Sequence, residues 1–147
     1  MPSSLLLHEE LTRSVIGAFF EVYNTLGFGF LEHLYVMAVE RELRARGHQV
    51  SREVYIPVAY KGELLGKQRL DMIVDNTLVV ETKSTYDLRR AATRQVYNYL
   101  RASGLDVGLV LHFGPQAKFC RVIAARNRHP DRRGRIDAPD GTDAPDE

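Results

Sequence analysis

The stretch Leu70–Lys83, with the sequence LDMIVDNTLVVETK, decides how the rest of the chain is interpreted. Its alternating pattern on both sides of residues 75–77 predicts two short strands joined by a tight turn. The first strand carries Asp71, and the return strand carries Glu81 and Lys83. An aspartate facing a Glu-x-Lys pair on the neighbouring strand is a set of side chains suited to binding a divalent cation and activating water.

The length of the turn decides whether these side chains meet, because side chains alternate between the two faces of a strand. With a two-residue loop, Asp71 and Glu81 lie on opposite faces of the hairpin. A three-residue loop over 75–77 instead pairs Val74 with Leu78 and sets Asp71 directly opposite Glu81. Asn76 tolerates the left-handed conformation that such loops use.

The three-residue loop also leaves one apolar face on the hairpin, and such a face is what sets register in a half-buried sheet. We expect that face to contain Leu70, Met72, Val74, Leu78, Val80 and Thr82. The same register sets Arg69 opposite Lys83. Two carboxylates facing each other repel in a bare sheet, and either a divalent cation such as Mg²⁺ or Mn²⁺, or salt bridges to Arg69 and Lys83, can remove that cost.

Hydrophobic periodicity around the hairpin predicts an α/β protein whose mixed sheet is flanked by helices, in the order ααβββαββ. The predicted helices cover residues 8–26, 31–46 and 88–103. The predicted strands cover residues 54–60, 66–74, 78–83, 107–113 and 118–125. The run 107–113 is almost wholly apolar, as in strands that are buried on both faces.

The third helix carries one stripe of side chains at helical spacing, formed by Leu88, Ala92, Gln95 and Tyr99. We expect Tyr99 to pack in the core. A glutamine within an otherwise apolar stripe, such as Gln95, needs a hydrogen-bond partner when it is buried.

The 147 residues are expected to form one domain over 1–125 and a disordered charged tail over 126–147. The single cysteine, Cys120, excludes an intramolecular disulfide and a cysteine-based zinc site. No leader and no membrane-length apolar run is found, so we expect a cytoplasmic protein. The formal net charge of +1 does not by itself indicate a nucleic-acid partner.

Five motifs in this order resemble the GxxExxY proteins, a family placed in the PD-(D/E)XK nuclease-like superfamily. The motifs are Gly29-Phe30-Leu31-Glu32-His33-Leu34-Tyr35, Arg69-Leu70-Asp71, Val80-Glu81-Thr82-Lys83, Gln95-Val96-Tyr97-Asn98-Tyr99-Leu100 and Gly108-Leu109-Val110-Leu111-His112-Phe113-Gly114. The likeness covers about residues 8–125. Leu70 stands where the superfamily pattern often has proline, which is a common departure.

This resemblance implies a restriction-endonuclease-like core and a Mg²⁺-dependent nuclease site. Asp71, Glu81 and Lys83 take the signature positions, and Glu32 is implied to be a further acidic member of the metal site. Gln95 is implied to support that site. From the residues alone, the dipole of the helix that it begins is the better explanation of Glu32. Tyr35, one turn later, either supports the site or packs in the core.

The sequence therefore predicts a Mg²⁺-dependent (or Mn²⁺-dependent) nuclease that hydrolyses phosphodiester bonds, in DNA, with a metal-activated water. The alternative is a catalytically silent module on the same fold that binds nucleic acid or protein. A small catalytic domain without a separate DNA-binding domain often works as a dimer, and we expect a homodimer.

Overall fold

The computed structural model describes residues 8–88 and 90–124, and the predicted charged tail lies outside them. The helices are α1 (Glu9–Leu26), α2 (Glu32–Ala45) and α3 (Arg90–Ser103). The strands are β1 (Val50–Tyr60), β2 (Glu63–Val74), β3 (Leu78–Lys83), β4 (Val107–Phe113) and β5 (Ala117–Ile123). The predicted order ααβββαββ and the α/β class are confirmed. No helix in the described ranges is long and apolar enough to cross a membrane.

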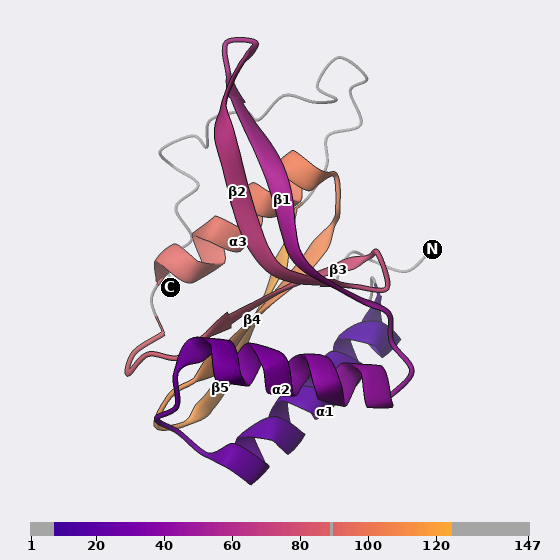
Figure 1. The fold of residues 1–147 in the computed structure, drawn as a ribbon, viewed down its shortest axis with the longest axis vertical. Coiled ribbons are helices and arrows are strands. Elements are labelled where there is room, and N and C mark those ends of the chain that lie inside the picture. The colour runs from indigo at the N-terminus through magenta and orange to yellow at the C-terminus, as the bar shows by residue number, and fades with distance from the viewer. Residues whose placement is uncertain (1–7, 89, 125–147) are drawn as a thin grey trace.

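The strands form one five-stranded sheet in sequence order, from β1 to β5. Only β3 and β4 run parallel, and the other neighbours are antiparallel. Parallel neighbours need a crossover connection, which α3 provides here. The helices α1 and α2 lie on one side of this sheet and α3 lies on the other (Figure 1). The mixed sheet flanked by helices is therefore present as predicted.

Two apolar clusters, one on each side of the sheet, hold these layers together. The cluster beneath α1 and α2 contains three aromatic rings in contact, because Phe113 packs against both Phe19 and Tyr35. Val79 and Val96 belong to the cluster beneath α3. All seven residues of β4 are buried, which is the property that its unbroken apolar sequence predicts.

Gly108 on β4 faces α3 at a point where no larger side chain fits. A Cβ atom at this position would lie 2.5 Å from Val96 Cγ1 and 3.3 Å from the Val79 carbonyl oxygen. We therefore expect Gly108→Ala to push α3 away from the sheet and to lower the free energy of unfolding by about 1–3 kcal/mol, the usual cost of overpacking. Urea denaturation measures this loss, and Gly66→Ala, where nothing lies within 4 Å of the added Cβ, is the control.

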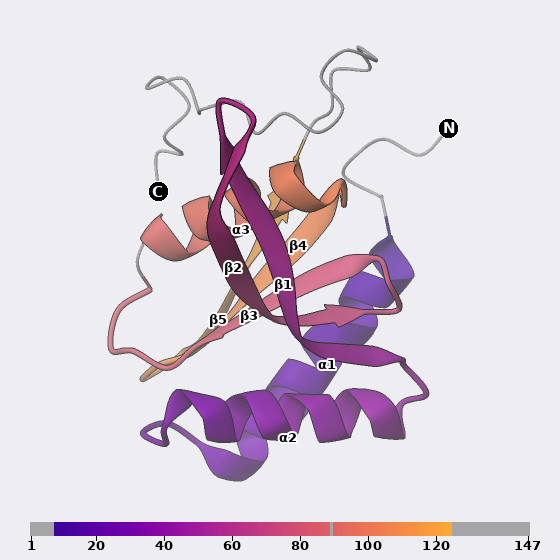
Figure 2. The ribbon, with the colours of Figure 1, turned by 45° about the horizontal axis from the view of Figure 1, so that its top comes forward.

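The β1–β2 hairpin is longer than its sequence pattern predicts and extends beyond the rest of the sheet (Figures 1 and 2). Glu53 has a left-handed backbone with φ of 54°. Glu53 has no partner in the β1–β2 ladder, although Arg52 and Val54 on either side of it are both paired. The two strands therefore depart from regular pairing beside Asp71.

This irregularity overturns the expectation of a single apolar face on the 70–83 hairpin. Met72 and Val74 pack beneath α1 and α2, as expected for one face. Leu70, two residues earlier, instead packs with Val79 in the cluster beneath α3. The pairing of β2 with β3 begins only at Met72. Leu70 lies before this paired segment, so its side chain can point to the opposite side of the sheet from Met72 and Val74.

The turn between β2 and β3 has the predicted three-residue length. Val74 pairs with Leu78, and Asp75 and Asn76 both have positive φ. A hydrogen-bonded chain that the pattern does not predict holds the turn against α1. In it, Ser14 Oγ lies 2.7 Å from His48 Nε2, and His48 Nδ1 lies 2.7 Å from Asp75 Oδ2. The position of the turn is therefore set by side chains far away in the sequence.

Candidate active site

Asp71 and Glu81 meet where β2 separates from β3. The ladder between the two strands ends at the pair Met72–Val80, and Asp71 and Glu81 occupy the next position. There the Asp71 N–H donates to Glu81 Oε1 at 2.7 Å, and the Thr82 N–H donates to Asp71 Oδ2 at 2.8 Å. Each carboxylate thus accepts a hydrogen bond from the backbone of the opposite strand. The predicted approach of the two acidic residues is confirmed.

Glu81 lies in an environment that disfavours its negative charge. Its side chain is only 5 % exposed. Burial is the largest cause that raises the pKa of Glu81, to about 7, and the charge of Asp71 raises it further. The hydrogen bond from the Asp71 backbone and the positive charge of Lys83 oppose this rise without cancelling it. A desolvated carboxylate beside a second carboxylate is a local excess of negative charge that a cation can neutralise.

Lys83 lies beside this pair, because residues two apart on a strand share a face. Its Nζ is 3.8 Å from Glu81 Oε2, and its side chain is 27 % exposed. The ammonium group is therefore close to the carboxylates and also accessible to solvent. This arrangement can hold a water molecule or a phosphate oxygen next to the acidic pair.

Arg69 does not lie opposite Lys83, and that expectation is wrong. The β2–β3 pairing ends at Met72, so Arg69 has no partner on β3. On the other side of β2, Arg69 pairs with Tyr55 of β1. Its guanidinium is 3.8 Å from Glu53, and both side chains are more than half exposed. Lys83 forms its ion pair with Glu81, whereas Arg69 forms its ion pair with Glu53 of β1.

Glu32 is the first residue of α2 and is exposed to solvent. Its charge is one of the causes that raise the pKa of Glu81, so α2 brings this carboxylate within electrostatic range of the acidic pair. Among residues 8–88 and 90–124, however, no three His, Cys, Asp or Glu side chains are grouped closely enough to hold a metal ion. Glu32 approaches the site without joining Asp71 and Glu81 in one cluster.

Tyr35 is fully buried and organises the loop that leads to Glu32. Its ring stacks on Phe113, with centroids 4.0 Å apart. Its hydroxyl donates to the Gly27 carbonyl oxygen at 2.5 Å and accepts from the Phe30 N–H at 3.1 Å. Tyr35 therefore packs in the core and also holds the backbone on the N-terminal side of Glu32, which combines the two alternatives that its sequence position leaves open.

Removal of this hydroxyl tests that role. We expect Tyr35→Phe to leave the Gly27 carbonyl and the Phe30 N–H without their partner and to lower the free energy of unfolding by about 1–3 kcal/mol. Thermal or urea denaturation measures the loss. The matched control is Tyr55→Phe, because Tyr55 is 56 % exposed. Equal stability of Tyr35→Phe and the wild type would contradict this role.

The helix α3 carries two further polar residues of interest, and the structure places one of them, Tyr99, near the acidic pair. Gln95 is half-buried and makes no hydrogen bond within the described part of the chain, so its supporting role stays a prediction. The Tyr99 hydroxyl lies 3.2 Å from both Gln68 Oε1 and the Arg69 carbonyl oxygen. Burial first, and then the charges of Glu81 and Asp71, raise the pKa of Tyr99 to about 12.

Tyr99 is therefore a neighbour of the acidic pair as well as the core residue that its apolar surroundings predict. The signal that could have found it is its spacing from Gln95, because residues four apart share one face of a helix.

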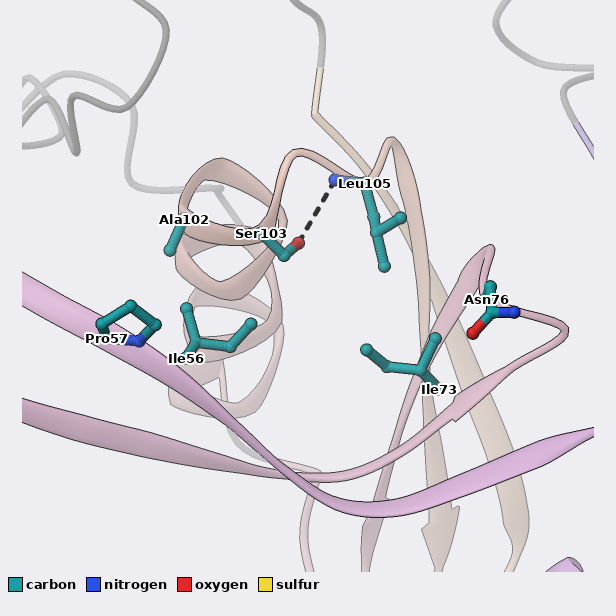
Figure 3. Close-up of a pocket in the computed structure, with 7 residues that line it drawn as sticks. All are labelled: Ile56, Pro57, Ile73, Asn76, Ala102, Ser103 and Leu105. Atoms are coloured by element: carbon teal, nitrogen blue, oxygen red, sulfur yellow. Dashed lines mark hydrogen bonds between the residues drawn. The ribbon is translucent and has the colours of Figure 1, made fainter.

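A separate shallow pocket of about 380 Å³ lies between the β1–β2 hairpin and the end of α3 (Figure 3). It is lined by Ile56, Pro57, Ile73, Asn76, Ala102, Ser103 and Leu105. None of these side chains is titratable, and none belongs to the acidic pair or its neighbours. The candidate catalytic groups therefore lie where β2 separates from β3 and not in this pocket.

Comparison with known proteins agrees with the fold. Residues 9–122 match the family model of the PD-(D/E)XK nuclease superfamily. Because this match covers most of the chain, the protein belongs to the PD-(D/E)XK nuclease superfamily, and membership indicates a nuclease-type function. The more specific GxxExxY assignment stays a prediction.

One similar solved structure is the crystal structure of SSO0001, with a TM-score of 0.54 and 15 % sequence identity. The match covers 84 % of this chain and 63 % of that one. At this level of identity the likeness concerns the fold alone. No curated protein sequence matches the chain.

Proposed function

We propose that the protein is a Mg²⁺-dependent or Mn²⁺-dependent nuclease that hydrolyses phosphodiester bonds in DNA. The observation that carries this proposal is the meeting of Asp71 and Glu81 at the end of the β2–β3 ladder, with Lys83 Nζ 3.8 Å from Glu81. Superfamily membership supports it, because membership indicates a nuclease-type function, and the sequence resemblance implies that these three residues take the signature positions.

The residues at this point fit a divalent cation. Asp71 Oδ2 and Glu81 Oε1 are used by backbone N–H groups. The other two oxygens, Asp71 Oδ1 and Glu81 Oε2, accept no hydrogen bond from the described residues. Carboxylate oxygens alone are the donors that Mg²⁺ and Mn²⁺ prefer. We propose that Asp71 and Glu81 hold the metal and that Glu32, which lies outside their cluster in this structure, would move towards them to complete the ligand set.

When bound, the cation would neutralise the acidic pair and stabilise the negative charge that develops on the phosphodiester in the transition state. The role of the protein side chains is to position the reactants. The Lys83 ammonium is proposed to orient the attacking water by donating a hydrogen bond to it, while its charge remains paired with Glu81 Oε2. Gln95, whose amide is not used by the described residues, is proposed to position Lys83 or the substrate.

The experiment is to incubate the purified protein with single-stranded, duplex and branched DNA in the presence of Mg²⁺ or Mn²⁺. We expect cleavage that EDTA abolishes and that Asp71→Ala lacks. Cleavage that persists in both Asp71→Ala and Lys83→Ala would come from a contaminating nuclease and would refute the proposal. Metal-independent DNA binding that is unaffected by Asp71→Asn, without cleavage, would identify a binding module instead.

A further inference from the structure

Two short loops beside the candidate site expose aromatic side chains. The first loop precedes α2 and carries Phe28 and Phe30, which are 46 % and 47 % exposed. The second follows β3 and carries Tyr86, which is 74 % exposed. These three residues are called the aromatic platform below. Exposed aromatic rings that lie together mark interaction surfaces, because their burial by a partner is favourable.

The two loops are connected to each other and fixed to the core. Ser84 Oγ donates to the Phe30 carbonyl oxygen at 2.7 Å. The rings of Phe28 and Tyr86 are in contact, with centroids 6.4 Å apart and planes at 71°. The buried His112 holds the second loop through its Nε2, which lies 2.8 Å from the Thr85 carbonyl oxygen. The platform is therefore a built feature of the fold and is present before any ligand arrives.

Each of the two loops of the platform is close in sequence to a residue of the proposed catalytic site. Phe30 lies two residues before Glu32, and Tyr86 lies three residues after Lys83. Three residues extend at most roughly 11 Å, which is the length of roughly three stacked nucleotides of one strand. Figures 1 and 2 both show the segment after β3 passing beside the start of α2. A strand whose phosphate is at Lys83 therefore has its neighbouring bases within reach of the platform.

We propose that the aromatic platform stacks unpaired bases, so that the protein acts on single-stranded DNA, flaps or frayed ends in preference to intact duplex. This inference rests on the proposed nuclease function. Aromatic side chains stack on any base, but only where the base is not already stacked and paired within a duplex. Lys83 lies three residues before Tyr86, and a divalent cation held by the acidic pair would add positive charge beside the platform. This charge fits a polyanion whose bases are exposed better than it fits an apolar protein surface.

The test measures binding without cleavage, so that its result does not depend on the catalytic proposal. Fluorescence anisotropy is recorded with a labelled thymidine oligonucleotide and with a duplex of equal length, both in EDTA. We expect the wild type to bind the single strand more tightly than the duplex. Phe28→Ala combined with Tyr86→Ala should weaken single-strand binding by roughly tenfold or more, because both rings that would stack on bases are removed, and should leave duplex binding unchanged.

Two variants serve as controls for this loss. Phe119→Ala removes an aromatic ring of similar exposure, 43 %, on the distant strand β5 and should bind as the wild type does. Tyr86→Phe keeps the ring and should retain single-strand binding. Thermal melting checks that each variant is folded, and Tyr86→Ala alone is a second test, since this exposed side chain contributes little to the core.

Equal wild-type affinity for the single strand and the duplex would overturn the proposal, and so would unchanged single-strand binding in the double variant. A double variant that binds single strands normally but sediments as a smaller species would identify the platform as an interface between copies of this chain, and would overturn it too. If the protein binds single strands through the platform but cleaves no DNA in Mg²⁺, the nuclease function fails while the binding surface stands.

Discussion

We expect Lys83→Ala to lower the rate constant for DNA cleavage by about 10²–10³-fold, the usual cost of removing one positioned hydrogen-bond donor at a reacting centre, and to leave metal binding intact. The reason is the position of its ammonium, 3.8 Å from Glu81 Oε2 and partly open to solvent. Removal of the side chain removes the group that orients the attacking water, whereas the carboxylates that we assign to the metal remain. Single-turnover cleavage at saturating protein measures the effect separately from binding.

Two variants make this prediction specific to Lys83. Lys67→Ala removes an exposed cation on the β1–β2 hairpin, and we expect its cleavage rate constant to remain close to the wild-type value. Lys83→Arg keeps the charge but changes the shape of the cation, and it should recover only part of the rate. A Lys83→Ala variant that cleaves at the wild-type rate would show that this side chain takes no part in the reaction.

We expect Glu81→Gln to stabilise the metal-free protein at alkaline pH and to abolish cleavage. The pKa of Glu81 is about 7 in the folded protein, against 4.5 for the ordinary side chain, chiefly because of burial and then because of Asp71. An acid whose folded pKa is raised contributes stability below its unfolded pKa and loses it as the pH rises through the folded pKa. The wild type is therefore destabilised between about pH 4.5 and pH 7, on the order of 3 kcal/mol in all.

Glutamine carries no charge, and its carbonyl oxygen can still accept from the Asp71 N–H. We therefore expect the free energies of unfolding of Glu81→Gln and the wild type to be similar at pH 4 and to diverge as the pH rises to 8. Urea denaturation in EDTA measures both. Glu63→Gln on the exposed end of the β1–β2 hairpin should show no such divergence. A constant difference between Glu81→Gln and the wild type from pH 4 to pH 8 would mean that the Glu81 carboxylate is not destabilised by its surroundings.

The meeting of Asp71 and Glu81 could be predicted from sequence because it depends only on alternation and on the length of one turn. The three residues 75–77 determine which side chains face each other. The side to which Leu70 points could not be predicted in this way. It depends on where β2 leaves β3, and on the irregular backbone at Glu53, a charged residue whose sequence carries no sign of a left-handed conformation.

Residues that reach the site from other elements were harder to place for a related reason. The approach of Glu32 depends on how the loop before α2 is held, and the Tyr35 hydroxyl holds it through contacts that helical spacing does not reveal. Tyr99 fits its apolar stripe, yet the reach of its hydroxyl to the Arg69 carbonyl depends on how closely α3 packs on the sheet. Periodicity predicts which face of a helix is buried, but not what the polar end of a buried side chain contacts.

The central claim is that Asp71 and Glu81 bind a divalent cation, and calorimetric titration with Mn²⁺ at pH 8 tests it most directly. At this pH the Glu81 carboxyl, with its pKa of about 7, is mostly ionised. We predict saturable binding by the wild type and by Lys83→Ala, and loss of that binding in Asp71→Asn and in Glu81→Gln. Absence of binding by the wild type at millimolar Mn²⁺, or equal binding by the wild type and Asp71→Asn, would contradict the claim.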